Sequence, residues 1–109
     1  MTTTISPTNT VLTLINVFTV NPENQQRLVN LLILTTERIM KKQPGYISAN
    51  IHKSLDGMRV VNYAQWQSRE DYEAIFQNPK FAEHMSEIMN FAKSDYHLYE
   101  VVYSDMVAD

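Results

Sequence analysis

The dipeptide Asp56-Gly57 most constrains the fold, because it lies between two stretches with the pattern of β-strands. Asp-Gly in that position is a strong signal for a β-hairpin. Tyr46 to Ser54 alternates apolar and polar side chains, which is typical of a strand with one apolar and one polar face. A second strand pattern runs from Met58 to Trp66. The sequence therefore predicts two adjacent antiparallel strands near the middle of the chain.

A strand and a helix are predicted before this hairpin. Val11 to Val20 is rich in β-branched residues and contains no breaker, so it predicts a buried strand. Asn21 suits the N-cap of a helix, and Pro22 suits its first position. The helix carries an apolar stripe and ends at Pro44-Gly45. The stripe consists of Leu28, Leu31, Leu32, Thr35 and Ile39.

Two helical segments and a strand are predicted after the hairpin. Ser68 and Asp71 resemble a capping box that begins a short helix. Asn78-Pro79 interrupts this helix and starts another. The apolar face of that further helix consists of Phe81, Met85, Ile88 and Ala92. The last strand is expected from Asp95 to Tyr103.

The order β-α-β-β-α-α-β predicts an α+β fold of the ferredoxin-like type. Four antiparallel strands would form one sheet, with the helices on one of its faces. The other face carries enough apolar surface that a second copy is its simplest cover, so we expect a homodimer. The 109 residues allow one domain, expected over 11–105. Residues 1–10 are expected to form a flexible N-terminal arm.

Composition excludes several classes of function. Nine Lys and Arg residues are scattered through a chain of net charge −3, so no nucleic-acid surface is expected. The longest apolar run, Leu31 to Leu34, is too short to cross a membrane. The N-terminus lacks the features of a signal peptide, so a cytoplasmic location is expected. No cysteine is present, and the three histidines lack metal-ligand spacing, so no metal site is predicted.

Several motifs together resemble one known family. Asn16 lies in the first strand, and Pro44-Gly45-Tyr46 begins the second. Trp66-x-Ser-x-Glu-x-Tyr72 follows the hairpin, and Asn78-Pro79-x-Phe81-x-x-His84 comes later. This pattern, from Val11 to Tyr103, is similar to that of the antibiotic biosynthesis monooxygenase superfamily. The resemblance implies a dimeric α+β barrel.

The resemblance also implies an activity. Members of the family that oxidise aromatic polyketides to quinones use O2 with no metal, flavin or haem. They place an Asn and a Trp on the third strand and a Tyr shortly after it, and Asn62, Trp66 and Tyr72 match that spacing. Ala64 departs from many small relatives, which carry Glu there. The implied function is a cofactor-independent monooxygenase that oxidises an aromatic phenol or hydroquinone with O2.

Two other interpretations remain open. A second branch of the family degrades haem with an Asn on the first strand, which Asn16 matches. Its helical Trp position holds Ile75 here, and His84 falls one residue before the family's axial ligand. A shift of one residue rotates a helical side chain by about 100° around the helix axis, so His84 would point away from the direction of the family's axial ligand. The other interpretation is a non-catalytic dimeric barrel that binds a ligand or responds to stress.

The candidate catalytic residues each allow a functional and a structural role. Asn62 could donate a hydrogen bond to a substrate carbonyl or a developing oxyanion, or could bond across the strands. Trp66 could stack on a flat ligand or anchor the core. Tyr72 could bind a substrate phenol or relay a proton, or could pack the helix on the sheet.

His52 is the candidate general base, since histidine changes charge between pH 5 and 8. Its position depends on the hairpin. A two-residue loop pairs Ile51 with Asn62 and turns His52 away from Asn62, whereas a three-residue loop with a bulge at Gly57 puts both on one face. The wall of the substrate pocket is expected to include Asn16, Phe81, His84 and Met85.

Overall fold

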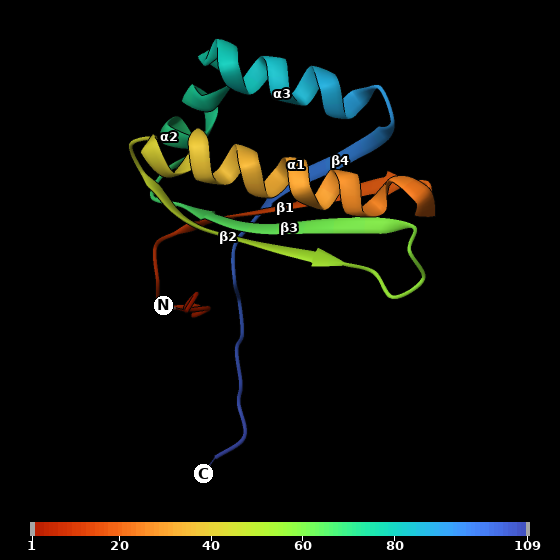
Figure 1. The fold of residues 1–109 in the computed structure, drawn as a ribbon. Helices are drawn as coiled ribbons and strands as arrows, with labels where there is room; N and C mark the ends of the chain where they lie inside the picture. Colours follow the sequence, from red (N-terminus) through yellow and green to blue (C-terminus); the bar gives the residue numbers. More distant parts are fainter. Residues whose placement is uncertain (1, 109) are drawn as a thin grey trace.

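The computed structural model describes residues 2–108, which form one α+β unit with a sheet on one side and helices on the other (Figure 1). The order of elements is the predicted one, with short 3-10 helices added at the ends of the α-helices. The elements are β1 Leu12–Val20, η1 Pro22–Asn24, α1 Gln25–Arg38, η2 Met40–Lys42, β2 Tyr46–Lys53, β3 Arg59–Trp66, α2 Arg69–Ala74, η3 Ile75–Gln77, α3 Pro79–Met89 and β4 Ala92–Tyr99.

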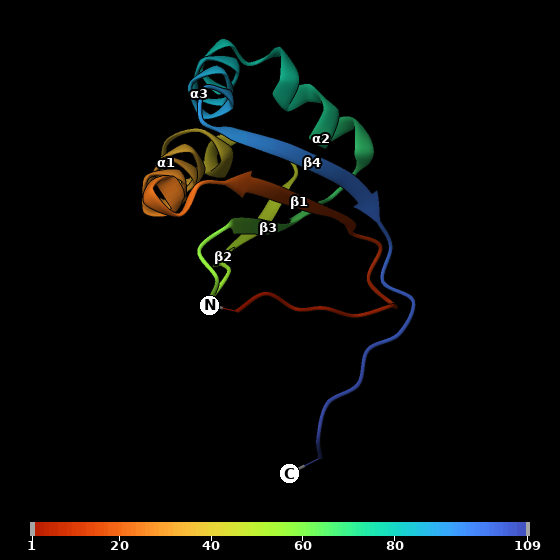
Figure 2. The same ribbon diagram turned by 90° about the vertical axis from the view of Figure 1, so that its right-hand side faces the viewer.

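The four strands form one antiparallel sheet in the order β2-β3-β1-β4. All the α-helices cover the same face of this sheet, as the view along it shows (Figure 2). The predicted α+β ferredoxin-like class is therefore confirmed. Within residues 2–108, no helix is both long enough and apolar enough to cross a membrane.

Local sequence signals explain where the helices after the hairpin begin. The Ser68 hydroxyl accepts a hydrogen bond from the Asp71 backbone N–H at 3.1 Å, which caps α2. The Asn78 side chain accepts hydrogen bonds from the backbone N–H groups of Lys80 and Phe81, and Pro79 occupies the first position of α3. The predicted cap and break thus lie where the sequence put them.

The hairpin between β2 and β3 decides the position of His52. Ser54 and Arg59 are joined by a backbone hydrogen bond, so the loop holds four residues, Leu55 to Met58. Neither predicted loop length is right, because the Asp56 carboxylate accepts hydrogen bonds from the Ser54 hydroxyl and the Met58 N–H and forms a longer turn. Ile51 nevertheless pairs with Asn62, the register expected for the two-residue loop. His52 therefore points to the face opposite Asn62.

The last helix and strand differ from the prediction. α3 ends at Met89, and Ala92 begins β4 opposite Val20 instead of extending the helical stripe. Strand β4 ends at Tyr99, four residues before the predicted end at Tyr103. The reason is tertiary: pairing with β1 along its whole length determines which residues become a strand, and helical periodicity alone does not record that pairing.

A row of polar side chains crosses the helix-covered face at the middle of the sheet. Asn62 of β3 pairs directly with Asn16 of β1, which pairs with Tyr96 of β4. On either side of this row the face is apolar, and the core accordingly forms two clusters. One cluster surrounds Phe18 and Leu28, and the other surrounds Trp66. The polar row thus divides the core.

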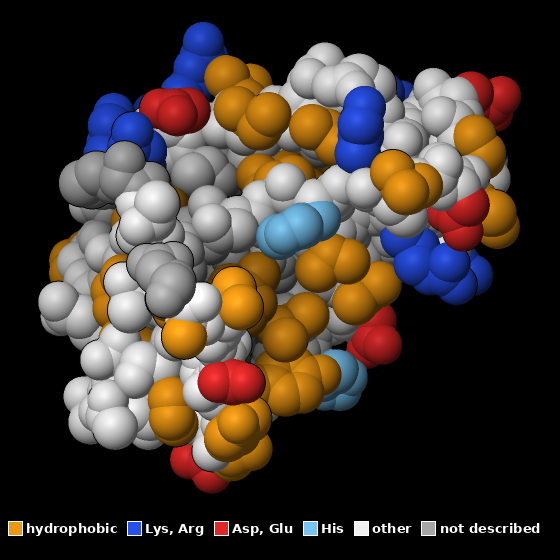
Figure 3. Space-filling view, turned by 90° about the horizontal axis from the view of Figure 1, so that it is seen from below, with side chains coloured by type: hydrophobic (Ala, Val, Ile, Leu, Met, Phe, Trp, Pro, Cys, Tyr) orange, Lys and Arg blue, Asp and Glu red, His pale blue; other side chains and the backbone are white. Residues whose placement is uncertain are grey.

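The opposite face of the sheet carries no helix. Hydrophobic side chains gather over much of it, between charged residues (Figure 3). The N-terminal arm lies across part of this face: Thr3 donates a hydrogen bond from its hydroxyl to Asn50 at 2.8 Å, and the Gln65 amide donates to the Thr4 carbonyl at 2.7 Å. The arm thus covers Gln65, which is 2% exposed.

Candidate functional site

A cavity of about 300 Å³ lies between the polar row and the helices, where the two core clusters leave space. Its volume is at the lower end of the range of about 300–1,000 Å³ found for small-molecule sites. Most of its lining is apolar, and Met40, Met85 and Met89 contribute flexible side chains that adapt to a ligand. The lining residues are Leu14, Asn16, Phe18, Leu32, Thr35, Thr36, Met40, Asn62, Tyr72, Ile75, Phe76, Phe81, Ala82, Met85, Met89, Ser94 and Tyr96.

Asn62 and Asn16 provide neighbouring amides on the sheet side of this cavity. The Asn62 side-chain oxygen is buried and has no hydrogen-bond partner within residues 2–108. The Asn16 side-chain oxygen accepts a hydrogen bond from the Ser94 hydroxyl at 2.8 Å, which leaves its NH2 group as the donor. The wall therefore offers an unused acceptor on Asn62 beside an amide donor on Asn16. Such a pair fits a ligand with a hydroxyl and a carbonyl oxygen.

Tyr72 lines the cavity from α2 and is 6% exposed. Burial raises the pKa of Tyr72 to about 12, and the nearby Tyr96 and Glu73 contribute in the same direction. The phenol therefore stays protonated at neutral pH and can donate a hydrogen bond. It is unsuited to act as a base.

Trp66 does not line the cavity. Its side chain is 0% exposed, and its ring contacts the edges of Tyr46 and Tyr72 at centroid distances of 5.8 and 6.1 Å. The expectation that a ligand stacks on this indole does not fit its position, because Tyr72 occupies the space towards the cavity. Trp66 instead supports Tyr72 from behind. Its ring N–H is buried and unpartnered within residues 2–108.

The histidines lie away from the lining. His52 is on the helix-free face, exposed, with its Nδ1 3.1 Å from the Asn50 carbonyl oxygen, so the predicted role of general base in this cavity does not fit. His84 stands behind the wall, and its Nδ1 is 2.8 Å from the Thr35 hydroxyl. Phe81 and Met85, also expected in the pocket, do line the cavity.

Several lining residues were not selected from the sequence. Ser94 and Tyr96 lie on β4. The predicted start of that strand, Asp95, left Ser94 outside it, and Tyr96 lay inside the predicted strand but was not assigned to the cavity. Phe76 belongs to η3 and packs on Tyr96 at a centroid distance of 6.2 Å. Thr35 belongs to the apolar stripe of α1, where a lone hydroxyl is the signal that could have identified it.

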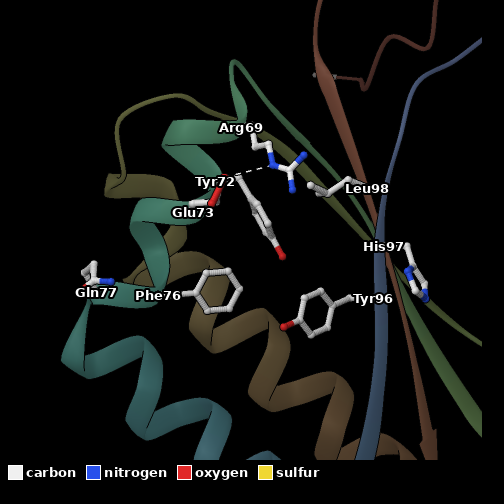
Figure 4. A pocket seen from close by; sticks show the side chains of 8 residues that line it. All are labelled: Arg69, Tyr72, Glu73, Phe76, Gln77, Tyr96, His97 and Leu98. Carbon is white, nitrogen blue, oxygen red and sulfur yellow. Dashed lines mark hydrogen bonds and ion pairs between the residues drawn. The ribbon is translucent and has the colours of Figure 1, made fainter.

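An open cleft adjoins the cavity and shares Tyr72, Phe76 and Tyr96 with it. The cleft lies between α2 and the edge strand β4, with the Arg69–Glu73 ion pair at its rim (Figure 4). The two nitrogen and oxygen atoms of that pair are 3.2 Å apart. The three shared aromatic residues separate the cleft from the cavity.

Neither a metal ion nor haem has an evident set of ligands at this site. Within residues 2–108, no three His, Asp or Glu side chains are grouped to hold a metal ion. An axial haem ligand would have to present a ring nitrogen to the cavity, but His84 is not part of the lining and its Nδ1 contacts Thr35. Ile75, which stands at the helical Trp position of the haem-degrading branch, is apolar and 2% exposed. The residues present do not fit haem.

The fold and the site define a class: a ferredoxin-like α+β protein with a ligand-sized, largely apolar cavity between sheet and helices. The family model for antibiotic biosynthesis monooxygenases matches residues 11–87. A curated relative, tetracenomycin-F1 monooxygenase from Streptomyces glaucescens, is 46% identical over 81 residues, which cover 74% of this chain and 72% of the relative. The chain therefore belongs to the antibiotic biosynthesis monooxygenase family.

Solved structures have the same fold. SnoaB, a cofactor-independent oxygenase from Streptomyces nogalater, has a TM-score of 0.74 at 20% identity, over 88% of this chain and 97% of SnoaB. A monooxygenase from the gene ActVA-Orf6 of Streptomyces coelicolor, in complex with the ligand nanaomycin D, has a TM-score of 0.72 at 27% identity. That match covers 90% of this chain and 92% of the other.

Proposed function

We propose that this chain is a cofactor-independent monooxygenase that oxidises a phenolic aromatic substrate to a quinone with O2. The observation that carries the proposal is the buried, unpartnered oxygen of Asn62 at the wall of an apolar cavity. A buried polar atom without a partner costs about 1–3 kcal/mol. A ligand that supplies the missing hydrogen bond would therefore stabilise the native fold. A phenolic O–H supplies that partner.

The reaction balances without a resident cofactor when the substrate is the reductant. An anthrone-type phenol gives up its two ring CH2 hydrogens, one atom of O2 becomes the new ring carbonyl, and the other leaves as water. Deprotonation makes the ring electron-rich, an electron passes to O2, and the oxygen then bonds to the ring carbon. Loss of water gives the quinone.

The cavity residues would serve this reaction by positioning and by stabilising charge. Asn62 would accept the substrate O–H, and Asn16 would donate its amide N–H to a ring oxygen as negative charge develops there. Tyr72, neutral because of its raised pKa, would donate to the same oxyanion. Phe81 and the methionines would exclude water from the anion.

The names of the relatives support this choice of reaction. SnoaB is described as a cofactor-independent oxygenase, and the ActVA-Orf6 protein was solved with a bound ligand, nanaomycin D. Tetracenomycin-F1 monooxygenase shares nearly half its residues with this chain over the matched region. We carry over to this chain the reaction class and leave the identity of the natural substrate open to experiment.

We also propose that the enzyme is a homodimer that pairs through the helix-free face of the sheet. Ile15 and Val17 of β1 and Tyr63 of β3 lie on that face by strand alternation. The buried Tyr63 hydroxyl has no partner within residues 2–108. A second sheet would cover these side chains and would form the dimeric barrel that the family resemblance implies.

Oxygen uptake with dithranol, an anthrone with two phenolic hydroxyls, tests the proposed activity. The protein is treated with a chelator and dialysed, and O2 consumption is followed together with quinone absorbance. We expect one O2 consumed per quinone formed, at a rate well above that in buffer. A rate equal to that of heat-denatured protein would contradict the proposal, as would activity that returns only when a metal or flavin is added.

A further inference from the structure

The proposed reaction needs a proton acceptor, and the lining of the cavity does not supply one. Among the described lining residues, the polar groups are amides, hydroxyls and two phenols. Tyr72 has a pKa raised to about 12, so its phenol is already protonated at neutral pH. Amides and alcohols do not accept a proton at neutral pH. The proton acceptor must therefore lie behind the lining residues and be connected to the cavity by hydrogen bonds.

Thr35 provides such a connection. It lines the cavity from α1, is 4% exposed, and its hydroxyl lies 2.8 Å from two groups: the Leu31 carbonyl oxygen and Nδ1 of His84. A hydroxyl has one proton, so it can donate to only one of these at a time. When it donates to Leu31, it accepts from a protonated Nδ1; when it donates to His84, Nδ1 is the acceptor.

We propose that Thr35 and His84 form a proton relay that removes the proton of the bound phenol. The relay rests on the proposed function. A second substrate O–H, not the one that bonds to Asn62, gives its proton to the Thr35 oxygen while the Thr35 proton passes to Nδ1 of His84, so the products are a phenolate and an imidazolium. After oxygen has added to the ring and water has left, Nδ1 returns its proton to Thr35 while the Thr35 proton passes to the phenolate oxygen. The phenol of the product and the neutral imidazole are both restored, so only the two ring CH2 hydrogens leave as water.

The charged groups near His84 come from both helices. On α3, Lys80 is one turn before His84, and Glu83 and Glu87 lie next to it and one turn after it. On α1, Arg38 is one turn beyond Thr35. These groups are of both signs and face solvent, and histidine is the type of side chain that ordinarily changes charge between pH 5 and 8.

Three variants test the relay. His84→Gln keeps a group that can bond to Thr35 but cannot take up a proton; Thr35→Val removes the hydroxyl at nearly constant shape; Thr35→Ser keeps the hydroxyl. With dithranol, we expect kcat to fall 10- to 100-fold in His84→Gln and Thr35→Val, and Thr35→Ser to stay within about threefold of wild type. The rise of kcat with pH between 5 and 8 should be lost in His84→Gln. Circular dichroism confirms that each variant folds.

The outcomes separate the relay from the proposed function. No quinone formation by wild type contradicts the proposed function itself. Quinone formation that is unchanged in His84→Gln, with the same pH profile, overturns the relay alone. A loss in His84→Gln without a loss in Thr35→Val shows that the proton does not travel through Thr35 and also overturns it. Equal losses in Thr35→Ser and Thr35→Val would assign Thr35 a packing role and overturn the relay.

Discussion

Asn62 is in the part of a protein where apolar side chains usually lie. It is flanked on its own face of β3 by Val60 and Ala64, which are 0% and 3% exposed, and its oxygen has no partner within residues 2–108. A leucine at this position would pack in the core without leaving a buried polar atom unpaired. The proposed role of this amide in substrate binding would explain why it is present although it lowers the stability of the unliganded chain.

This gives a prediction with opposite signs for stability and activity. Asn62→Leu should raise the free energy of unfolding by about 1 kcal/mol, because it removes an unpartnered buried amide. It should lower kcat with dithranol by about 100-fold, because the substrate O–H loses the acceptor that positions the ring. Urea denaturation and oxygen uptake measure the two effects.

Asn30→Leu is the matched control, since Asn30 is exposed on α1 and does not line the cavity. It should leave both the free energy of unfolding and kcat near their wild-type values. An Asn62→Leu protein that is less stable than wild type, or equally active, would contradict the assigned role.

Tyr72 predicts a dependence of stability on alkaline pH. The unfolded chain ionises this phenol near its ordinary pKa of about 10, whereas the folded chain holds its proton up to about 12. The folded state is therefore favoured below pH 10, and this contribution, on the order of 2 kcal/mol, is lost as pH rises from 10 to 12. Tyr72→Phe should show a shallower loss of stability over that range, measured by urea denaturation at each pH.

Tyr103→Phe provides the comparison, because Tyr103 is 76% exposed in the C-terminal segment. Its slope between pH 10 and 12 should match that of wild type. If Tyr72→Phe and wild type lose stability in parallel, the phenol is not buried against ionisation.

At the scale of elements, the two glycines hold turns that orient β2 and β3. Gly45 and Gly57 both have φ of +80°, in the region that favours glycine. Gly45 also lies against Asp71 so closely that an added Cβ would overlap the carboxylate and the Cβ of Asp71. Because Tyr72 follows Asp71, this contact fixes the start of α2 and one wall of the cavity.

Gly45→Ala and Gly57→Ala should therefore differ. Both add an unfavourable backbone conformation, which costs about 1–2 kcal/mol. Near Gly57 the closest atom to an added Cβ is Pro22 Cβ at 3.4 Å, an ordinary contact. Gly45→Ala should lose about 1–3 kcal/mol more than Gly57→Ala, which is the usual cost of overpacking. Thermal and urea unfolding of the two variants measure the difference, and equal losses would contradict the account.

The elements also show what the sequence could and could not predict. The hairpin, the cap at Ser68 and the break at Asn78-Pro79 are encoded by neighbouring residues, and all three were found. The length of the hairpin loop depends on the Asp56 side chain bonding to its own turn, and the start of β4 depends on pairing with β1. The pairing of β4 with β1 joins residues far apart in the sequence, and the bonds of Asp56 are one of several that its side chain could make, so local patterns revealed neither.

The site was predicted in part for the same reason. Asn16, Asn62, Tyr72, Phe81 and Met85 lie on elements whose faces follow from periodicity, and all line the cavity. His52 depended on the hairpin register. Trp66 shares the face of Asn62, but a residue's face does not say whether a neighbour such as Tyr72 screens it from the cavity.

At the scale of the whole molecule, the helix-free face predicts self-association. The chain has a mass of 12.7 kDa, so we expect analytical ultracentrifugation at micromolar concentration to give a species of twice that mass. Val17→Arg places a charge on the helix-free face of β1 and should shift the species to the monomer, because an unpaired charge is costly to bury in an interface.

Asn30→Arg, on the exposed surface of α1, should remain dimeric and controls for the added charge. A wild-type protein that sediments as a monomer, or a Val17→Arg protein that sediments as a dimer, would contradict pairing through this face.

The central claim is that a phenolic ring occupies the cavity between the asparagine pair and the helices. A crystal structure of the protein with 1,8-dihydroxyanthraquinone tests it most directly. We predict the rings inside the cavity, with a phenolic oxygen within hydrogen-bonding distance of the Asn62 side-chain oxygen and another ring oxygen near the Asn16 amide. Rings bound only in the outer cleft beside Arg69, or an empty cavity at saturating ligand, would contradict the account.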